Sequence, residues 1–279
     1  MQVIKVMVNG LPGNMAQVVV RHVLADQRFA LVPFSLTGPE ITATSHAVGD
    51  TAVTLIQPHL RRTLLEKIRP ADSDLISVDY THPSAVNDNA RFYCESGLPF
   101  VMGTTGGDRR GLEETVKASS VAAVIAPNMA KQIVGFQAMM AFAADNFPNL
   151  FRGYALSIRE SHQNGKADTS GTAKAMVAYF NSLGAPFSEE RIEKERRPEI
   201  QRDQWGIPEA YLSGHGWHTY SLVSADGTVR FEFTHNINGR DVYGDGTMDA
   251  ICFLADKIAQ GITGKVFTMI DVLKAGSLM

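Results

Sequence analysis

Short apolar runs rich in β-branched residues alternate with helix-like segments through the first half of this 279-residue chain. The first run, residues 3–8, ends at Asn9 and Gly10, and residues 15–24 then place apolar side chains at helical spacing. The alternation continues with strand-like runs at residues 30–34, 75–78, 99–102 and 121–125 and helix-like segments at residues 56–68, 84–95 and 108–119. Strands that alternate with helices form βαβ units, which build a parallel sheet covered by helices on both faces. We therefore predict an α/β fold with a Rossmann-type, doubly wound parallel sheet.

The pattern changes after residue 129. The predicted elements there are a helix at residues 132–144 and strands at residues 154–160, 219–224 and 229–235. Asp226-Gly227 separates the last two strands and is a strong hairpin signal, because such a turn needs positive φ angles. Val229, Phe231 and Phe233 are expected on the buried face of the resulting sheet.

The end of the chain predicts a discontinuous domain layout. The Arg- and Glu-rich residues 188–203 are expected to form a solvated helix or loop. Residues 247–260 have a helical pattern, and residues 266–273 are expected to return the chain to the first domain. The predicted domains are residues 1–129 with 241–279, and residues 130–240 as an α+β domain with an open mixed sheet.

Composition excludes several classes of protein. With 44% hydrophobic and 20% charged residues, the chain is neither disordered nor of low complexity. Its 26 Lys and Arg against 29 Asp and Glu provide too little positive charge for an extended nucleic-acid footprint. Cys94 and Cys252 lie far apart and form no CxxC or Cys/His cluster, so we expect no metal site. No apolar run is long enough for a membrane helix and no secretory signal is seen, so the expected location is the cytoplasm.

A glycine turn follows the first predicted strand and opens the first predicted helix. It consists of Gly10, Leu11, Pro12, Gly13, Asn14 and Met15. Glycines let a backbone approach a pyrophosphate, and the free amides of a helix N-terminus attract its charge. The GxGxxG spacing is not satisfied, so the turn alone is equally consistent with a dinucleotide site and with an ordinary strand-to-helix turn. Its place in the first βαβ unit favours the dinucleotide site.

The end of the second predicted strand bears on the choice of cofactor. An NAD site usually places an Asp or Glu there, which binds the ribose hydroxyls. Here the strand ends at Ser35, and no acidic residue follows until Glu40. A 2′-phosphate would meet hydroxyl groups at this position rather than a carboxylate. We therefore predict that NADPH is at least as good a hydride donor as NADH.

Two further segments follow predicted strands, at the edge of a parallel sheet where ligands bind in open α/β folds. The first segment consists of Gly103, Thr104 and Thr105, and the second of Ala126, Pro127, Asn128 and Met129. The first is equally consistent with a simple turn and helix N-cap. The second is consistent with a hinge or with an ordinary loop.

The densest polar constellation lies between residues 160 and 173. His162 and Lys166 can deliver protons and neutralise an anionic substrate. Ser170, Gly171 and Thr172 precede a predicted helix, whose hydroxyl cap and free amides would accept a carboxylate. A polar surface loop with a structural histidine is the alternative. The joint occurrence of these groups favours a functional site.

These motifs occur in the order seen in the 4-hydroxy-tetrahydrodipicolinate reductases, also called dihydrodipicolinate reductases. The most specific of them is the pattern Glu160-x-His162-x-x-x-Lys166-x-Asp168-x-Ser170-Gly171-Thr172-Ala173. The chain resembles this family over nearly its whole length, and residues 128–132 and 161–163 resemble the plant branch most. A transit-peptide extension is not seen, so we expect a bacterial relative of that branch or a mature form from a plastid-type compartment.

The resemblance implies an activity and roles for individual residues. The family reduces the cyclic product of pyruvate and aspartate semialdehyde condensation to tetrahydrodipicolinate, on the route to diaminopimelate and lysine. By this resemblance His162 is the general acid/base, Lys166 is a proton donor that pairs with the substrate, and Gly171 and Thr172 bind a carboxylate. Gln163 stands where many bacterial members carry a second histidine, and is expected to be a neutral substrate contact. The segments that match cofactor contacts are residues 10–15, 103–105 and 126–129.

The resemblance also implies domain roles and partners. The first domain would bind NADPH, with NADH possible, and the second would bind a small dicarboxylate and mediate oligomerisation. A homo-oligomer is expected, either a tetramer or a dimer. Two alternatives stay open. One is another NAD(P)-dependent aspartate or semialdehyde dehydrogenase, which would not need the set of His162, Lys166 and Ser170 to Thr172. The other is a nonenzymatic NADPH-sensing module.

Overall fold

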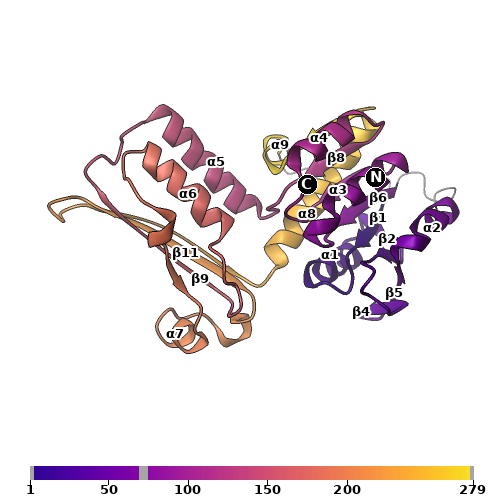
Figure 1. The fold of residues 1–279 in the computed structure, drawn as a ribbon, viewed down its shortest axis with the longest axis horizontal. Coiled ribbons are helices and arrows are strands. Elements are labelled where there is room, and N and C mark those ends of the chain that lie inside the picture. Colours follow the sequence, from indigo (N-terminus) through magenta and orange to yellow (C-terminus); the bar gives the residue numbers. More distant parts are fainter. Residues whose placement is uncertain (1–2, 69–74, 277–279) are drawn as a thin grey trace. The chain divides into compact units, whose positions relative to one another are not determined.

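The computed structural model describes residues 3–68 and 75–276, shown as a ribbon in Figure 1. The chain divides into two compact units, Met1–Lys131 with Asp241–Met279, and Gln132–Arg240. Among the described residues, the first unit contains two sheets and the second contains one. The functions expected for the two domains stay predictions. Within the described ranges, no helix is both long and apolar enough to cross a membrane.

The first unit contains a six-stranded sheet whose strand pairs are all parallel. In spatial order the strands are β13 (Lys265–Phe267), β8 (Ala122–Ile125), β7 (Phe100–Met102), β6 (Leu75–Asp79), β1 (Ile4–Asn9) and β2 (Phe29–Leu31). The chain runs from β1 to β2 on one side and later enters β6 on the other, so the order reverses between β1 and β6. Ligands of open α/β sheets bind beyond the carboxyl ends of the strands at such a point. The predicted doubly wound parallel sheet is confirmed.

Helices cover both faces of this sheet. They are α1 (Asn14–Ala25), α2 (Arg61–Ile68), α3 (Val86–Glu95), α4 (Arg109–Lys117), α8 (Asp241–Ala259) and α9 (Met269–Lys274), with single 3-10 turns at Pro58–Leu60 and Pro83–Ala85. α1 packs on α8, and α3 packs on α4. One core joins Met7 and Phe100 of the sheet to Phe92 of α3 and Leu112 of α4. Val6 is equally buried but points to the opposite face, because neighbouring residues of a strand alternate in direction.

The second predicted strand, residues 30–34, is wrong as a single element. Pro33 has no amide hydrogen and a fixed φ, and the segment divides there into β2 and β3 (Phe34–Leu36). β3 pairs with β5 (Thr51–Ile56), which also pairs with β4 (Ser45–Val48) in a separate three-stranded sheet. The sequence pattern does not predict β4, because Ser, His and Ala have little preference for strands.

The second unit contains a four-stranded mixed sheet, as predicted. Its spatial order is β10 (Glu193–Glu195), β9 (Ala155–His162), β11 (His215–Val223) and β12 (Arg230–Asn238). β10 and β9 are parallel, whereas the other pairs are antiparallel. α5 (Lys131–Asn146) and α6 (Gly171–Ser182) supply the rest of the core. In that core Met140 of α5 and Phe180 of α6 belong to one cluster with Ile158 and Tyr220 of the sheet.

Two expectations for this unit are wrong in part. Residues 188–203 are not only a solvated stretch, because they form a 3-10 turn at Glu189–Arg191, the strand β10 and the helix α7 (Pro198–Asp203). Val229 and Phe231, expected on a buried face, are 40% and 45% exposed. β12 is the outermost strand of the sheet and has a neighbour on one side only, so these side chains gain fewer covering partners.

Candidate cofactor loops and active site

The predicted cofactor segments follow neighbouring strands of the parallel sheet. Residues 10–15 follow β1, residues 103–105 follow β7 and residues 126–129 follow β8. These strands and β6 are adjacent in the sheet, in the order β8, β7, β6, β1. Backbone hydrogen bonds join the strand ends, as where the amide of Gly103 donates to the carbonyl of Asp79 at 3.0 Å. The structure thus gathers the three segments at one carboxyl edge.

The glycine turn leaves no room for side chains at its two glycines. Gly10 has a φ of +106°, and a Cβ built on it would lie 2.1 Å from the carbonyl oxygen of Tyr80. A Cβ on Gly13 would lie 2.8 Å from the carbonyl oxygen of Gly10. α1 begins directly after Gly13 without a side-chain cap. The amides of Asn14 and Met15 have no hydrogen-bond partner among the described residues, so they can donate hydrogen bonds to an anion.

A buried carboxylate supports these loops from behind. Asp79, the last residue of β6, accepts hydrogen bonds from the hydroxyls of Tyr93 at 2.7 Å and Thr104 at 2.6 Å. The side-chain amide of Asn89 donates at 3.0 Å to Oδ2 of Asp79, which is the oxygen that also accepts from Tyr93. Thr104 is therefore occupied in holding the loop after β7. The sequence pattern does not single out Asp79.

The predicted cofactor residues differ in how much of each reaches the surface. The exposed ones are Pro12, Gly13, Asn14, Thr105 and Pro127. The half-buried ones are Gly10, Met15, Gly103 and Asn128. The buried ones are Leu11, Ser35, Thr104, Ala126 and Met129. Side-chain contact with a ligand is open to the first two groups, whereas the buried residues hold the loops in shape.

Ser35 lies behind the glycine turn, and its hydroxyl accepts a hydrogen bond from the amide of Leu11 at 3.2 Å. The carboxylate of Glu40 folds back over Gly38, where a built Cβ would lie 2.3 Å from each of its oxygens. The carboxylate of Glu40 therefore lies near the end of β3, although Glu40 is several residues further along the sequence. This charge disfavours a 2′-phosphate, so the preference for NADPH stays a prediction.

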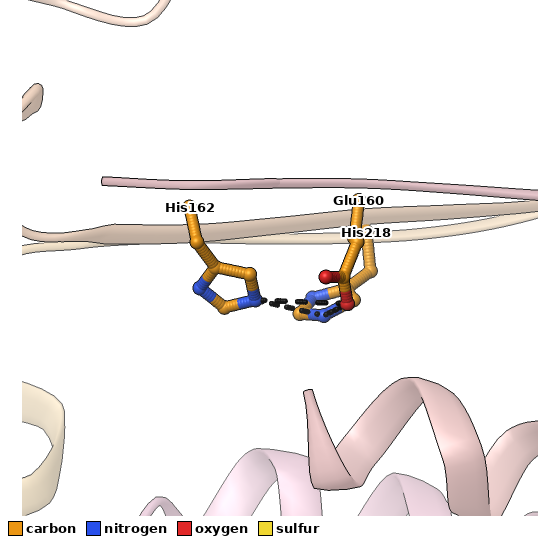
Figure 2. A group of neighbouring side chains, drawn as sticks. All are labelled: Glu160, His162 and His218. Atoms are coloured by element: carbon orange, nitrogen blue, oxygen red, sulfur yellow. Dashed lines mark hydrogen bonds and ion pairs between the residues drawn. The ribbon is translucent and has the colours of Figure 1, made fainter. Parts of the chain in front are cut away.

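In the second unit, one face of the mixed sheet carries a row of titratable side chains. Glu160 of β9 stands directly opposite His218 of β11, and His218 stands opposite His235 of β12. His162 is two residues beyond Glu160 on the same strand, so it points to the same face. Figure 2 shows Glu160, His162 and His218 converging as their side chains project from the strands toward the helices.

His162 is held in one orientation. Its Nδ1 lies 3.1 Å from the carbonyl oxygen of His215, so we assign the ring hydrogen to Nδ1 and the lone pair to Nε2. Nε2 in turn lies 3.3 Å from Nε2 of His218. Gly216 stands opposite His162, and a Cβ there would come within 3.0 Å of the imidazole. Burial, together with the nearby His218, lowers the pKa of His162 to about 4, so the imidazole is neutral at pH 7.

Glu160 is an ionised carboxylate inside the unit. Its side chain is 0% exposed, and it pairs with the guanidinium of Arg196, which is 17% exposed. The amide of Ser170 donates to Oε2 at 3.1 Å, and Nε2 of His218 lies 3.5 Å from the same oxygen. Burial alone would raise the pKa of Glu160, but hydrogen bonds from His218, Arg196 and Ser170 outweigh it and hold the pKa well below its usual range.

The start of α6 adjoins this cluster. Ser170 is the N-cap, and its hydroxyl accepts from the amide of Ala173 at 3.0 Å and lies 2.9 Å from Nε2 of His218. The amides of Gly171 and Thr172 have no partner among the described residues, and a Cβ on Gly171 would meet nothing within 4 Å. Unpaired amides at a helix N-terminus attract a carboxylate.

Lys166 and Gln163 lie in the loop between β9 and α6. The ammonium of Lys166 is 2.8 Å from the carboxylate of Asp168, whose side chain is 76% exposed. The side chain of Lys166 is only 23% exposed, but solvent reaches Asp168 and weakens the pair, so Lys166 can exchange Asp168 for a ligand carboxylate. Arg196 fixes the loop by donating from Nε to the carbonyl of Lys166 at 2.8 Å. Gln163 is half-buried, and its backbone carbonyl accepts a hydrogen bond from the backbone amide of Lys166 at 3.2 Å.

Sequence reasoning missed two members of this cluster. His218 had a usable signal, because the alternation in its strand places it on the same face as buried Tyr220. Arg196 had none, since its partner Glu160 is 36 residues away and its neighbours are charged and mostly exposed. The charged residues 188–203 therefore include one buried contact of the candidate site, the ion pair of Arg196 with Glu160.

Comparison with known proteins places the chain in a family. A model of the dihydrodipicolinate reductase N-terminus matches residues 4–129, and a model of the C-terminus of the same enzyme matches residues 133–273. The chain is 44% identical over 276 residues to 4-hydroxy-tetrahydrodipicolinate reductase 1, chloroplastic, of Arabidopsis thaliana, covering 99% of this chain and 79% of the relative. It is 30% identical to the 4-hydroxy-tetrahydrodipicolinate reductase of Herminiimonas arsenicoxydans, covering 92% of this chain and 95% of the relative.

A solved structure agrees at the level of the fold. Dipicolinate-bound dihydrodipicolinate reductase from Paenisporosarcina sp. TG-14 matches with a TM-score of 0.66 and 18% identity, covering 96% of this chain and 98% of that one. The two family models together span nearly the whole chain, and the plant relatives share the sequence over the same extent. This chain therefore belongs to the dihydrodipicolinate reductase family.

Proposed function

We propose that this protein is an NAD(P)H-dependent 4-hydroxy-tetrahydrodipicolinate reductase of diaminopimelate and lysine biosynthesis. In this reaction 4-hydroxy-2,3,4,5-tetrahydrodipicolinate takes up a hydride and a proton and loses its hydroxyl group as water. Family membership and the activity named for the plant relatives support the assignment. The structural observation that carries it is the oriented, neutral His162, which shares one loop-and-strand region with Lys166 and the unpaired amides of Gly171 and Thr172.

The second unit offers a separate partner to each of two substrate carboxylates. One carboxylate would bind the amides of Gly171 and Thr172 at the start of α6. Lys166 would leave the exposed Asp168 and pair with the other. Gln163 would add a neutral hydrogen bond without a titrating proton. Both carboxylates would then be fixed, which orients the ring between them.

His162 and Lys166 would handle the protons. The hydrogen on Nδ1 of His162 is directed to the carbonyl of His215, so Nε2 is a base at neutral pH. A bound dicarboxylate adds negative charge beside the ring and raises the pKa of His162, which lets the imidazolium return a proton. The ammonium of Lys166 is a second donor.

The loops of the first unit fit a nicotinamide dinucleotide. The turn at Gly10 and Gly13 allows close backbone approach, and the uncapped start of α1 offers amides for a pyrophosphate. Asn14, Thr105 and Asn128 are the polar predicted residues with exposed surface there. When bound, the reduced nicotinamide supplies the hydride.

The partners proposed are a small dicarboxylate and further copies of this chain, in a dimer or a tetramer. The exposed Val229 and Phe231 beside the edge of the mixed sheet support that part of the second unit as the oligomer contact. The plant relatives are named chloroplastic, and a plastid or the cytoplasm is the compartment we propose. Both cysteines are free thiols, which suits a reducing compartment.

One coupled assay tests the function. Pyruvate, aspartate semialdehyde and the upstream synthase generate the substrate in the reaction mixture. The absorbance of NADPH is then followed after this protein is added. We expect rapid loss of absorbance with wild type and very little with His162→Gln. His59→Gln is the matched control, because His59 is an exposed histidine in the first unit. Binding of NADPH without turnover would instead favour the sensing module.

A further inference from the structure

Three potential ligand atoms on the mixed sheet form a nearly equilateral triangle (Figure 2). Nε2 of His162 and Nε2 of His218 are 3.3 Å apart. Oε2 of Glu160 lies 3.5 Å from Nε2 of His218 and 3.9 Å from Nε2 of His162. A single point lies about 2.1 Å from all three atoms, which is the length of a zinc bond to nitrogen or oxygen. The triangle therefore has the size of three ligands around one metal ion.

The surroundings of His162 and Glu160 suit metal binding. Histidine ligands commonly donate their other ring hydrogen to a carbonyl, as His162 does to His215 at 3.1 Å. Arg196 and the amide of Ser170 hold the carboxylate of Glu160 in place, with Oε2 toward the histidines.

His218 adds an independent observation. Its Nε2 is within 3.5 Å of Ser170, Glu160 and His162 at once, although one ring nitrogen can donate only one hydrogen. Its Nδ1 is buried and has no hydrogen-bond partner within the described part of the chain. Buried polar atoms are normally satisfied, so the unpartnered Nδ1 is unusual. With a cation at the centre of the triangle, the ring hydrogen of His218 would be on Nδ1, and the lone pairs of Nε2 of both histidines and of Oε2 of Glu160 would face the ion.

The charge of the site does not oppose a divalent ion. The guanidinium of Arg196 is balanced by Glu160, and the ammonium of Lys166 by Asp168. Two imidazoles and one carboxylate suit zinc, cobalt, nickel or copper, whereas magnesium and calcium prefer oxygen ligands. The side chain of His162 is 13% exposed, which leaves the site a route to solvent.

We propose that Glu160, His162 and His218 form a binding site for a zinc-class divalent ion, and that the ion inhibits the protein. The bound ion would take the lone pair of Nε2 of His162. The inhibition rests on the proposed function, in which this lone pair is the base, whereas the binding does not. Two of the ligands are 56 residues apart on different strands, so sequence spacing does not reveal the set.

Binding is tested with cobalt(II) on chelator-treated, nucleotide-free protein. We expect the visible absorption bands of low-symmetry cobalt to saturate at one ion per chain and to disappear when zinc is added. His218→Gln should weaken cobalt binding at least about 10-fold, because one of three ligands is lost. His235→Gln is the matched control, since His235 packs beside His218 at 4.6 Å between ring centres and is outside the triangle. If wild type gives no cobalt bands, or if both variants bind alike, the site is overturned.

Inhibition is tested separately in the reductase assay. Zinc should inhibit wild type, a chelator should restore activity, and His218→Gln should lose zinc sensitivity by the same factor as it loses cobalt affinity. Equal zinc sensitivity of wild type and His218→Gln would overturn the inhibitory role and point to another group, such as His22 between Asp241 and Asp245. A protein that shows the cobalt bands but has no reductase activity would contradict the proposed function and leave the ion site standing.

Discussion

Replacing Arg196 with glutamine would leave the carboxylate of Glu160 without its cation. The side chain of Glu160 is 0% exposed and that of Arg196 is 17% exposed, so the carboxylate itself has no contact with solvent in the folded protein. Removing one partner of such a buried pair typically costs about 3–5 kcal/mol. The bond from Arg196 to the carbonyl of Lys166 adds about 1 kcal/mol. We therefore expect Arg196→Gln to lower the free energy of unfolding of the second unit by about 4–6 kcal/mol.

The chain carries its own reporter for this measurement. Its two tryptophans, Trp205 and Trp217, both lie in the second unit, so their fluorescence follows the unfolding of that unit. Urea titrations at pH 7 would compare wild type, Arg196→Gln and the double variant Glu160→Gln/Arg196→Gln. The double variant is expected to recover more than half of the lost free energy of unfolding, because it removes the buried carboxylate of Glu160 as well as Arg196.

Arg202→Gln is the matched control for this experiment. Arg202 pairs with Asp203 on the surface, and both side chains are at least half exposed. Its loss should leave the free energy of unfolding nearly unchanged, because solvent screens an exposed ion pair. An effect of Arg196→Gln no larger than that of Arg202→Gln would refute the reasoning. Equal destabilisation of the single and double variants would show that the loop contacts, and not the buried charge, are responsible.

The remaining predictions concern the site and its titration. His162→Gln and Lys166→Ala should each lower kcat about 100-fold or more, with the dissociation constant for NADPH nearly unchanged in a fluorescence titration. Gly10→Ala should weaken NADPH binding at least about 10-fold in the same titration, because the new Cβ has no space and the φ is +106°. Burial lowers the pKa of His162 to about 4 and that of His235 to about 3 in the folded protein. As the pH falls below about 6.5, these histidines therefore become protonated in the unfolded chain before they do so in the folded protein, which favours unfolding. With a chelator present, urea titrations at pH 7 and pH 5 should therefore show the second unit losing about 2 kcal/mol per histidine, and unchanged stability would contradict these pKa values. Glu40→Gln should raise the ratio of kcat/KM for NADPH to that for NADH, because it removes a carboxylate from the end of β3.

Most of the fold follows from local pattern, and the differences have local physical causes. The βαβ alternation predicts the parallel sheet because each strand is a short apolar run bounded by turn residues. Pro33 divides one such run into two strands, although the apolar pattern continues across it. The strand at residues 193–195 has almost no apolar character, and only its pairing with β9 makes it a strand.

The sequence predicts the residues of the candidate site that lie in one continuous stretch, but not those that the fold brings in from distant elements. His162, Lys166 and Ser170 to Thr172 stand within one stretch, so their residue types and the helix start are visible in the sequence. Glu160 looks like a surface acid in that stretch, yet its partner Arg196 and its neighbour His218 come from distant strands and loops. Such contacts depend on which residues of neighbouring strands lie opposite each other. The sequence does not reveal this register for a sheet with both parallel and antiparallel pairs.

The environment of His162 suggests how one imidazole could serve both as base and as acid. A pKa of about 4 makes the free imidazole a proton acceptor, and acting as an acid near neutral pH requires a rise of about 3 units. Three units correspond to about 4 kcal/mol. One carboxylate about 4 Å from the ring, at an effective dielectric constant of about 20, contributes close to that amount. The substrate would therefore supply the charge that converts His162 from base to acid, because burial and the nearby His218 and Arg196 already outweigh the upward effect of Glu160 on the pKa of His162.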